Sequence, residues 1–343
     1  MLSHVQRHAA IYIQVSVSFI ATIIFVSLFY KPLTYFVSRD GNPAITRFTE
    51  EESNSLQPKT IVKTGLYVKD FPKFDVKNNK FQFEGVLSFE YDPKEVSAEQ
   101  LDSFNFERGQ IVYKSKPAIR KIGNKRLTYY TIWVEFDNDM NYKRFPFDDH
   151  QLHIVFQNQQ LSPDEVIFQS NNNRFIVIAN RYIEAWKGIN TFTTSGYVEE
   201  VLERIEKPQT TILYPRIIFS IDYSRYSLRP LFMILLPLLG LFLILIFSLI
   251  PTNEHLYGTR LMMCTSVISA LIFYLFAITP NTPKVGYMMI SDFIYIYVLT
   301  CAMVIFGITL ACKNLSIPFR VLINVVANSG LVILFYYLLY VQA

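Results

Sequence analysis

One apolar stretch of the chain reads LMMCTSVISALIFYLFAI and runs from Leu261 to Ile278. Three further apolar segments flank it, at Leu231–Ile250, Met288–Ala311 and Val321–Tyr340. Each approaches the ~20 residues that an α-helix needs to cross about 30 Å of hydrocarbon. Backbone polar groups in lipid must be satisfied internally, so helices are the expected structure. Residues 229–343 therefore predict a four-helix transmembrane bundle.

The composition indicates a membrane protein and argues against several other classes. Hydrophobic residues make up 51% of the 343-residue chain, and its mean hydropathy is +0.24. The net charge of +4 comes without a basic block, so nucleic acid is not an expected partner. No phosphate-binding glycine loop, zinc-ligand spacing or nucleophile elbow occurs, so we expect no enzyme, cofactor or metal. All three cysteines lie in or beside the apolar segments, at Cys264, Cys301 and Cys312.

A fifth apolar stretch lies near the amino terminus, at Ile11–Phe29. It is longer than the roughly 7–15 apolar residues of a signal peptide, and no A-x-A pattern follows it. The pattern favours an uncleaved anchor over residues 1–30, with a cleaved signal peptide as the alternative. Both interpretations export the residues that follow.

The basic residues of the loops predict the orientation of the chain. If the amino terminus is cytoplasmic, residues 31–228 are exported and Pro251–Arg260 and Lys313–Arg320 face the cytoplasm. Both of these loops carry basic residues, as the positive-inside rule requires. We therefore expect a multi-pass protein of the cell membrane, most simply the bacterial inner membrane, with the exported block in the periplasm or outside the cell.

The exported block has the alternation of β-strands. β-Branched and aromatic runs separated by turn residues predict strands at Ile61–Val68, Lys80–Phe89, Thr128–Phe136, Leu152–Gln157 and Ile212–Tyr223. Strands at such intervals favour a β-sandwich over residues 58–228, and the polar residues 31–57 read as a linker. The expected fold is thus a β + α membrane protein, an extracytoplasmic β-sandwich followed by four transmembrane helices, with an additional amino-terminal helix.

One face of the predicted Leu261–Ile278 helix combines serines with phenylalanines. Steps of four and three residues select Met262, Ser266, Ser269, Phe273, Phe276 and Pro280. Hydroxyls can hydrate a passing ion, and rings of phenylalanine can close a pore by dewetting. Serines can equally serve as helix–helix contacts in a lipid-embedded bundle. The helix alone leaves both interpretations open.

Several motifs resemble those of the pentameric ligand-gated ion channels, the Cys-loop receptor superfamily. The segment Arg144–Ile154 reads RFPFDDHQLHI and is similar to that family's Phe-Pro-Phe-Asp loop. Further similarities, in the family's order, are Lys116–Ile119 with Asn124 (the Pro-x-Ile…Asn segment), Ala185–Lys187 with Phe192 (the Trp-containing strand), Arg225 (the pre-helix arginine), Pro237 (the first-helix proline) and Pro283–Tyr287 (the linker between the second and third helices). The resemblance covers about residues 58–341.

The sequence also departs from the family pattern. Asn138 and Leu152 stand at about the positions of the loop cysteines, so the chain resembles a prokaryotic member without the disulfide. The amino-terminal helix is not part of the common plan.

The resemblance implies a ring of identical subunits, a pentamer, with the serine and phenylalanine stripe lining a pore for ions. It also implies coupling residues between the two domains. Asp148 is expected to pair with Arg225, and Phe147 to pack near Pro283 and Tyr287. The acidic ring of cation-selective relatives falls on Gly258 and Thr259, with Glu254 farther back, and we favour cation selectivity.

In the family, agonists bind between subunits beneath a hairpin, which corresponds here to Glu203–Thr210. Aromatic candidates for this site, which could hold an amine by cation–π attraction, are Tyr67, Tyr113, Phe168, Phe175 and Tyr214. A small molecule or a proton is the expected agonist, and His150 and His153 are the candidate proton sensors. The alternative function is a non-conducting membrane receptor or assembly subunit with the same fold.

Overall fold

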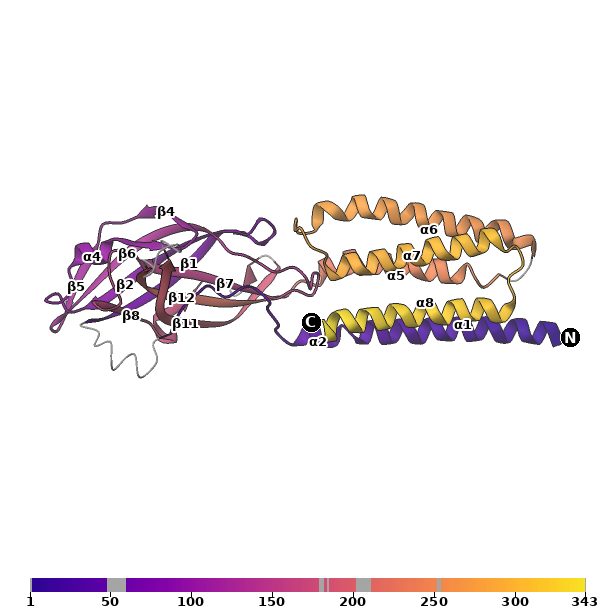
Figure 1. The fold of residues 1–343 in the computed structure, drawn as a ribbon, viewed down its shortest axis with the longest axis horizontal. Coiled ribbons are helices and arrows are strands. Elements are labelled where there is room, and N and C mark those ends of the chain that lie inside the picture. The colour runs from indigo at the N-terminus through magenta and orange to yellow at the C-terminus, as the bar shows by residue number, and fades with distance from the viewer. Residues whose placement is uncertain are drawn as a thin grey trace. The chain divides into compact units, whose positions relative to one another are not determined.

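The computed structural model describes residues 2–47, 60–178, 182–183, 185–201, 211–251 and 254–342 (Figure 1). The chain divides into two units, each with its own core. The helical unit comprises Met1–Val37, Tyr142–Asp148 and Ser227–Ala343, and the β unit comprises Ser38–Asn141 and Asp149–Tyr226. Each unit therefore combines segments that are distant in the sequence.

The first sheet of the β unit has seven strands among the described residues. Its main path runs β4-β6-β2-β1-β8, with β5 paired to β6 and β9 paired to β1. The strands are β1 (Thr60–Asp75), β2 (Lys80–Tyr91), β4 (Gly109–Lys114), β5 (Ala118–Ile122), β6 (Lys125–Asp137), β8 (Val166–Gln169) and β9 (Phe175–Val177). Every second residue of β2 from Phe81 to Tyr91 is buried, because alternate side chains of a strand point to opposite faces.

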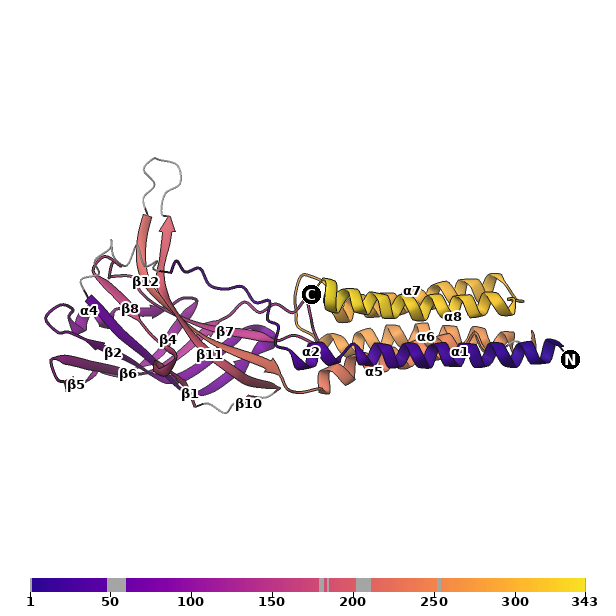
Figure 2. The same cartoon turned by 90° about the horizontal axis from the view of Figure 1, so that it is seen from below.

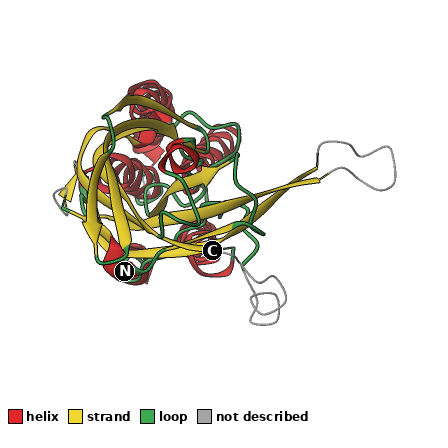
Figure 3. Cartoon of the chain, turned by 90° about the vertical axis from the view of Figure 1, so that its left-hand side faces the viewer, coloured by secondary structure: helices red, strands yellow, loops and turns green. Residues whose placement is uncertain are grey.

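The second sheet has five strands in the part of the chain that the structure describes, in the order β10-β11-β12-β7-β3. They are β3 (Phe104–Phe106), β7 (His150–Asn158), β10 (Tyr182–Ile183), β11 (Trp186–Val201) and β12 (Thr211–Arg225). β11 and β12 pair along their full length and form a long hairpin, which extends beyond the neighbouring strands (Figures 2 and 3).

The core of the β unit lies between the two sheets and is largely aromatic. Phe89 of β2 packs against Phe156 of β7, with ring centroids 5.7 Å apart. Phe74 of β1 packs against Tyr223 of β12 at 5.0 Å. The two sheets therefore face each other across a buried layer in which ring contacts add to the burial of apolar area.

The five strands predicted from alternation are confirmed within β1, β2, β6, β7 and β12. The stretch Ala98–Phe106 holds a short helix, α4 (Ala98–Asp102), followed by β3. Ser97 caps α4, since its hydroxyl accepts from the backbone N–H of Gln100.

Residues 38–47, which we call the N-terminal arm, fall in the segment expected to be a linker and hydrogen-bond along the β unit. Ser38 forms an isolated bridge with Asp149, and Thr46 forms another with Tyr197. The guanidinium of Arg216 donates to the carbonyl oxygen of Ala44 at 2.8 Å. The arm thus adds backbone contacts to Asp149, just before β7, and to the β11–β12 hairpin.

The helical unit contains α1 (Leu2–Ser27), α2 (Tyr30–Thr34), α5 (Arg229–Phe247), α6 (Tyr257–Ile278), α7 (Ile290–Ala311) and α8 (Ile317–Tyr336). Among the described residues, five segments are long and apolar enough to cross a membrane, and they correspond to α1, α5, α6, α7 and α8. The chain therefore has the character of a multi-pass membrane protein. Within the unit, α5, α6 and α7 contact one another, α7 contacts α8, and α8 lies along α1 (Figure 1).

Polar side chains join α1 to α8 at the level of Ser18. The side-chain amides of Asn324 and Asn328 each donate to the hydroxyl of Ser18 at 3.4 Å. Asn328 also donates to the side-chain oxygen of Asn324 at 3.0 Å, and all three residues are buried. Amides between membrane helices gain by finding partners on a neighbour, so these contacts orient α1 against α8.

Candidate functional site

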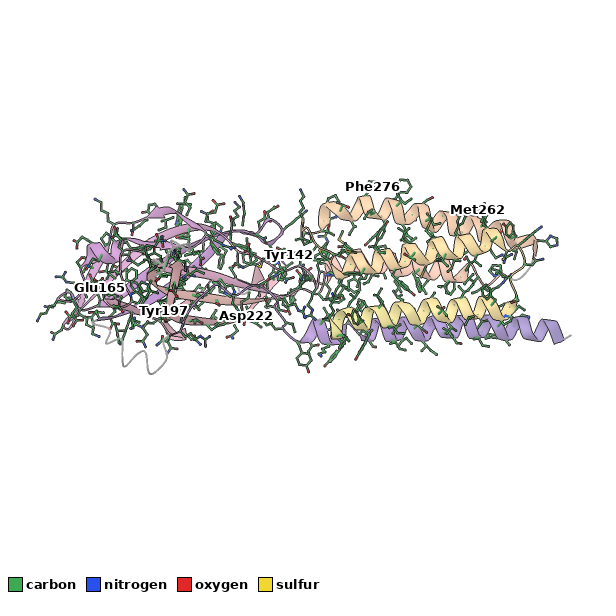
Figure 4. The ribbon with its side chains drawn as sticks, viewed as in Figure 1. Tyr142, Glu165, Tyr197, Asp222, Met262 and Phe276 are labelled. Carbon is green, nitrogen blue, oxygen red and sulfur yellow. The ribbon has the colours of Figure 1, made fainter. Side chains whose placement is uncertain are left out.

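The predicted stripe forms one exposed face of α6 and its extension. Met262, Phe273 and Phe276 are 69%, 74% and 71% exposed in the single chain. Ser266, Ser269 and Pro280 are exposed too. At 3.6 residues per turn the six positions fall within an arc of roughly 80°. Figure 4 shows Met262 and Phe276 on the side of α6 that is turned away from α5 and α7.

The opposite face of α6 is buried, and this orients the helix. Its buried residues are Arg260, Cys264, Val267 and Leu271, at spacings of three and four. The sulfur of Cys264 lies 3.5 Å from the hydroxyl of Ser248, just beyond α5. The Tyr274 hydroxyl donates to the carbonyl oxygen of Ile234 in α5 at 2.9 Å. α6 is therefore held by its buried face. The face that carries the serines and phenylalanines is not buried by any described part of the helical unit.

The serines of this face differ from the neighbouring threonine. The Thr265 hydroxyl donates to the carbonyl oxygen of Leu261 at 3.1 Å, as hydroxyls in apolar helices commonly do. The hydroxyls of Ser266 and Ser269 form no hydrogen bond within the described part of the chain. Gly258 and Thr259 are also exposed, whereas the side chain of Glu254 lies outside the described residues.

Residues Tyr142–Asp148, here the coupling loop, belong to the helical unit and contact the α6–α7 linker and the first residues of α7. The backbone N–H of Tyr142 donates to the hydroxyl of Tyr287 at 2.9 Å. The backbone N–H groups of Ile290 and Ser291 donate to the carbonyl oxygens of Lys143 and Phe145 at 3.1 and 3.3 Å. Pro283 is buried in the same linker. The structure therefore brings the loop and the linker together.

Phe147 lies in a cluster of aromatic rings that the sequence analysis did not predict. Its ring centroid is 5.3 Å from that of Phe29, after α1, and 5.8 Å from that of Phe335 in α8. Phe25 of α1 packs on Phe335 at 4.5 Å. No local motif marks Phe25, Phe29 or Phe335, and the contact of Phe147 with Pro283 stays a prediction. The pairing of α1 with α8 could have been predicted from polar residues at the same spacing of four in both apolar segments. These are Gln14 with Ser18 and Asn324 with Asn328.

The predicted ion-pair partners lie in different units. Asp148 is buried in the helical unit. Arg225 ends β12 in the β unit, where its guanidinium lies 4.3 Å from the ring centroid of Trp186, a cation–π contact. Asp149, the neighbour of Asp148, accepts from the Ser224 hydroxyl and the backbone N–H of Arg225 at 2.9 and 3.2 Å. The Asp148–Arg225 pair itself stays a prediction.

The two histidines after the coupling loop have different surroundings. Nδ1 of His150 lies 3.1 Å from the carboxylate of Asp40, and both side chains are fully buried. His153 of β7 is buried beside Ser220 of the neighbouring strand β12, with Nδ1 2.9 Å from the Ser220 hydroxyl. Burial lowers the pKa of His153 to about 4, so this imidazole is neutral near pH 7. Of the two candidate proton sensors, His150 is the one beside an acid.

The five aromatic candidates for the ligand site are spread over the β unit. Phe168 and Phe175 are buried in the core, against Phe156 and Phe219 respectively. Tyr214 of β12 is also buried, while Tyr67 of β1 is half-buried. Tyr113 of β4 is 48% exposed and packs on Trp133 at 5.4 Å, a partner that the sequence analysis did not include.

The strand order limits which of these aromatics can meet within one chain. β6 and β2 separate β4 from β1, so Tyr113 and Tyr67 lie three strand spacings apart, or roughly 14 Å. The hairpin Glu203–Thr210 lies outside the described residues.

Among the residues that the structure describes, no group of His, Cys, Asp and Glu side chains could hold a metal ion. Comparison of the chain with protein-family models and with curated proteins found no match, so the resemblance to the pentameric channels rests on the motifs quoted above.

Proposed function

We propose that the chain is a subunit of a pentameric ligand-gated ion channel. A small molecule or a proton acting on the exported β-sandwich would open a pore lined by α6 in a bundle of α5–α8. The observation that carries the proposal is the single face of α6 on which two serines, two phenylalanines and a methionine are exposed while the opposite face is buried.

The chemistry of this face favours a pore. Serine hydroxyls that faced lipid would lack partners other than their own backbone, whereas in a ring they would face water and ions. Five phenyl groups at the levels of Phe273 and Phe276 would form a dry constriction that resists hydrated ions. Heterologous contacts between identical subunits close most simply into a cyclic ring. The partners are therefore identical subunits, the lipid bilayer, permeant ions and an agonist.

The contacts of the coupling loop are a second argument for the same proposal. Its hydrogen bonds hold it against Tyr287 of the linker that follows the proposed pore helix and against Ile290 and Ser291 at the start of α7. A displacement of the loop would thus be transmitted to the linker that connects α6 and α7. We favour cation permeation and the inner membrane of a bacterium, with the β unit in the periplasm or outside. The function is ion transport and signalling, with no catalytic role.

The test is ion flux from liposomes that contain the purified chain. Phe273→Ala and Phe276→Ala should raise flux in the absence of agonist, because each removes one ring of the constriction. Phe232→Ala is the matched control, since Phe232 is 55% exposed but lies on α5. In a background with the native cysteines changed to alanine, Ser269→Cys should react with water-borne thiol reagents and Val267→Cys should not. Negligible flux from intact rings of both phenylalanine variants, together with an unreactive Ser269→Cys, would contradict the assignment of α6 as a pore helix.

A second candidate function is a non-conducting receptor or assembly subunit. It is favoured by one observation, the packing of Phe29, which follows the additional helix, against Phe147 of the coupling loop. Such a receptor would pass a change in the β unit to a partner through α1. Rings that never conduct but change the exposure of α1 residues on agonist binding would support it.

A further inference from the structure

A single carboxylate joins the two backbone stems of the coupling loop. Oδ1 of Asp40 accepts from the backbone N–H of Asn141, just before the loop, at 2.6 Å. Oδ2 of Asp40 accepts from the backbone N–H of Gln151, just after the loop, also at 2.6 Å. The side chain of Asp40 is fully buried. Asp40, Asn141 and Gln151 all belong to the β unit.

Neighbouring groups in the N-terminal arm reinforce this arrangement. The Ser38 hydroxyl donates to Oδ2 of Asp40 at 3.0 Å, and the carbonyl oxygen of Arg39 accepts from the side-chain amide of Asn141 at 3.1 Å. Nδ1 of His150 lies 3.1 Å from the same carboxylate. Polar groups from both stems therefore converge on two consecutive residues of the arm, Arg39 and Asp40.

A second set of hydrogen bonds crosses the stems without the arm. The side-chain amide of Asn138 donates to the carbonyl oxygen of Gln151 at 3.1 Å. The side-chain oxygen of Asn138 accepts from the backbone N–H of His153 at 3.4 Å. These bonds flank Leu152, so Asn138 lies alongside Leu152 across the base of the loop.

We propose that Asp40 is a positioning residue that closes the base of the coupling loop, so that the N-terminal arm fixes the spacing of the two stems within the β unit. Hydrogen bonds from backbone N–H groups to a buried carboxylate are charge-assisted and stronger than neutral ones. Loss of the carboxylate leaves part-buried backbone donors on both stems without this acceptor, and an unmade hydrogen bond away from water costs free energy. Together, Asp40 and Asn138 hold the two stems at a fixed separation by hydrogen bonds, as a covalent cross-link between the stems would. The consequence for channel opening rests on the proposed function, whereas the closure of the loop does not.

The closure is tested by hydrogen exchange on the purified full-length chain. Asp40→Ala should speed the exchange of peptides that span Asn141 and Gln151 about tenfold or more, while peptides from β1 and β2 keep their protection. Asp40→Asn, which keeps the shape and one acceptor oxygen, should give an intermediate effect. The control is Arg39→Ala, because the side chain of Arg39 is exposed and only its backbone oxygen contacts Asn141. Unchanged exchange in both Asp40 variants would overturn the proposal.

A cross-link separates closure of the loop from simple anchoring of the arm. Asn138→Cys with Leu152→Cys, added to Asp40→Ala in a background without the native cysteines, should restore protection of the loop when oxidised and lose it on reduction. If Asp40 only anchored the arm, the disulfide would restore nothing, and the proposal would fall.

The same variants test the effect on opening. In the proposed channel, with protons as the probe agonist, Asp40→Ala should shift the proton concentration for half-maximal flux at least about threefold. The oxidised cross-link should return this midpoint toward the parent value, and Arg39→Ala should leave it unchanged. An unshifted midpoint despite faster exchange would overturn the positioning role. A parent protein that carries no flux would remove the proposed function, and the exchange and cross-link results would still decide the closure of the loop.

Discussion

The side-chain amide of Asn328 in α8 donates a hydrogen bond of 3.4 Å to the hydroxyl of Ser18 in α1, 310 residues away in the sequence. Gln14, one turn before Ser18, is buried as well. α1 therefore presents polar groups to a specific partner helix, which a signal peptide that is removed after export does not require. The retention of α1 as an anchor stays a prediction.

The Ser18–Asn328 contact should stabilise the helical unit measurably. Ser18→Ala and Asn328→Ala should each lower its free energy of unfolding by about 0.5–2 kcal/mol, the range for hydrogen bonds between membrane helices. The double variant should lose less than the sum, because the two residues share one contact. Unfolding in mixed micelles measures these values. Thr22→Ala is the control, since the Thr22 hydroxyl donates to the backbone of its own helix, at Ser18 O, 2.8 Å away.

Removal of the Phe147 ring should destabilise the helical unit. Phe147 is buried against Phe29 and Phe335, and truncation of a buried phenylalanine costs about 3–5 kcal/mol. Phe147→Leu, which keeps most of the volume, should cost less. Thermal unfolding in detergent measures both variants against Phe232→Ala, which removes an exposed ring. Equal losses for Phe147→Ala and Phe232→Ala would contradict the role of the ring cluster.

Asp148→Asn and Arg225→Gln should change channel opening more than assembly. If the two side chains pair as the resemblance implies, a double-mutant cycle on the opening equilibrium should give a coupling energy of about 1 kcal/mol or more. Agonist midpoints from flux assays supply the four corners of the cycle. Asp139→Asn is a suitable control, because Asp139 is exposed and pairs with Arg108 at the surface. Strictly additive effects would remove the proposed pair.

Acid should destabilise the β unit through His153. Burial lowers the pKa of His153 from 6.5 to about 4, so between these values the unfolded chain binds the proton that the folded chain excludes. The stabilising contribution of the neutral imidazole is full above pH 6.5 and is lost as the pH falls toward 4, by roughly 3 kcal/mol.

The measurement is thermal unfolding between pH 4 and 7.5. His153→Gln should flatten the acid side of this profile, although it also costs stability at pH 7. His255→Gln, which changes an exposed histidine of the helical unit, should leave the profile unchanged. A parallel profile for the parent and His153→Gln would show that His153 is not the group responsible.

Local patterns in the sequence predicted the elements of this fold. The apolar runs at Leu231–Ile250 and Leu261–Ile278 correspond to α5 and α6, and the alternation at Lys80–Phe89 corresponds to β2. Hydrophobic period and length carry this information, because they depend only on neighbours in the chain. The stripe from Met262 to Phe276 could be selected by the same period, since residues three and four apart share a face of a helix.

Residue type alone could not separate the core from the surface. Phe168 and Tyr113 were equal candidates for a ligand site, yet Phe168 is 1% exposed and Tyr113 is 48% exposed. The difference arises because Phe168 lies in β8 facing the opposite sheet, whereas Tyr113 lies on the outer face of β4. Which face a strand buries depends on the partner sheet, and an aromatic residue suits both positions.

What the sequence by itself determined is the set of membrane helices, the principal strands and the periodic face of α6, because each follows from interactions within a single segment. Only the tertiary structure decided that Ser18 meets Asn328, that Phe29 packs on Phe147, and that Asp40 bonds both Asn141 and Gln151. Those contacts join segments up to 310 residues apart. A short polar side chain can bond to any donor that the path of the chain brings within about 3 Å, so its partner is defined only once the whole chain has folded.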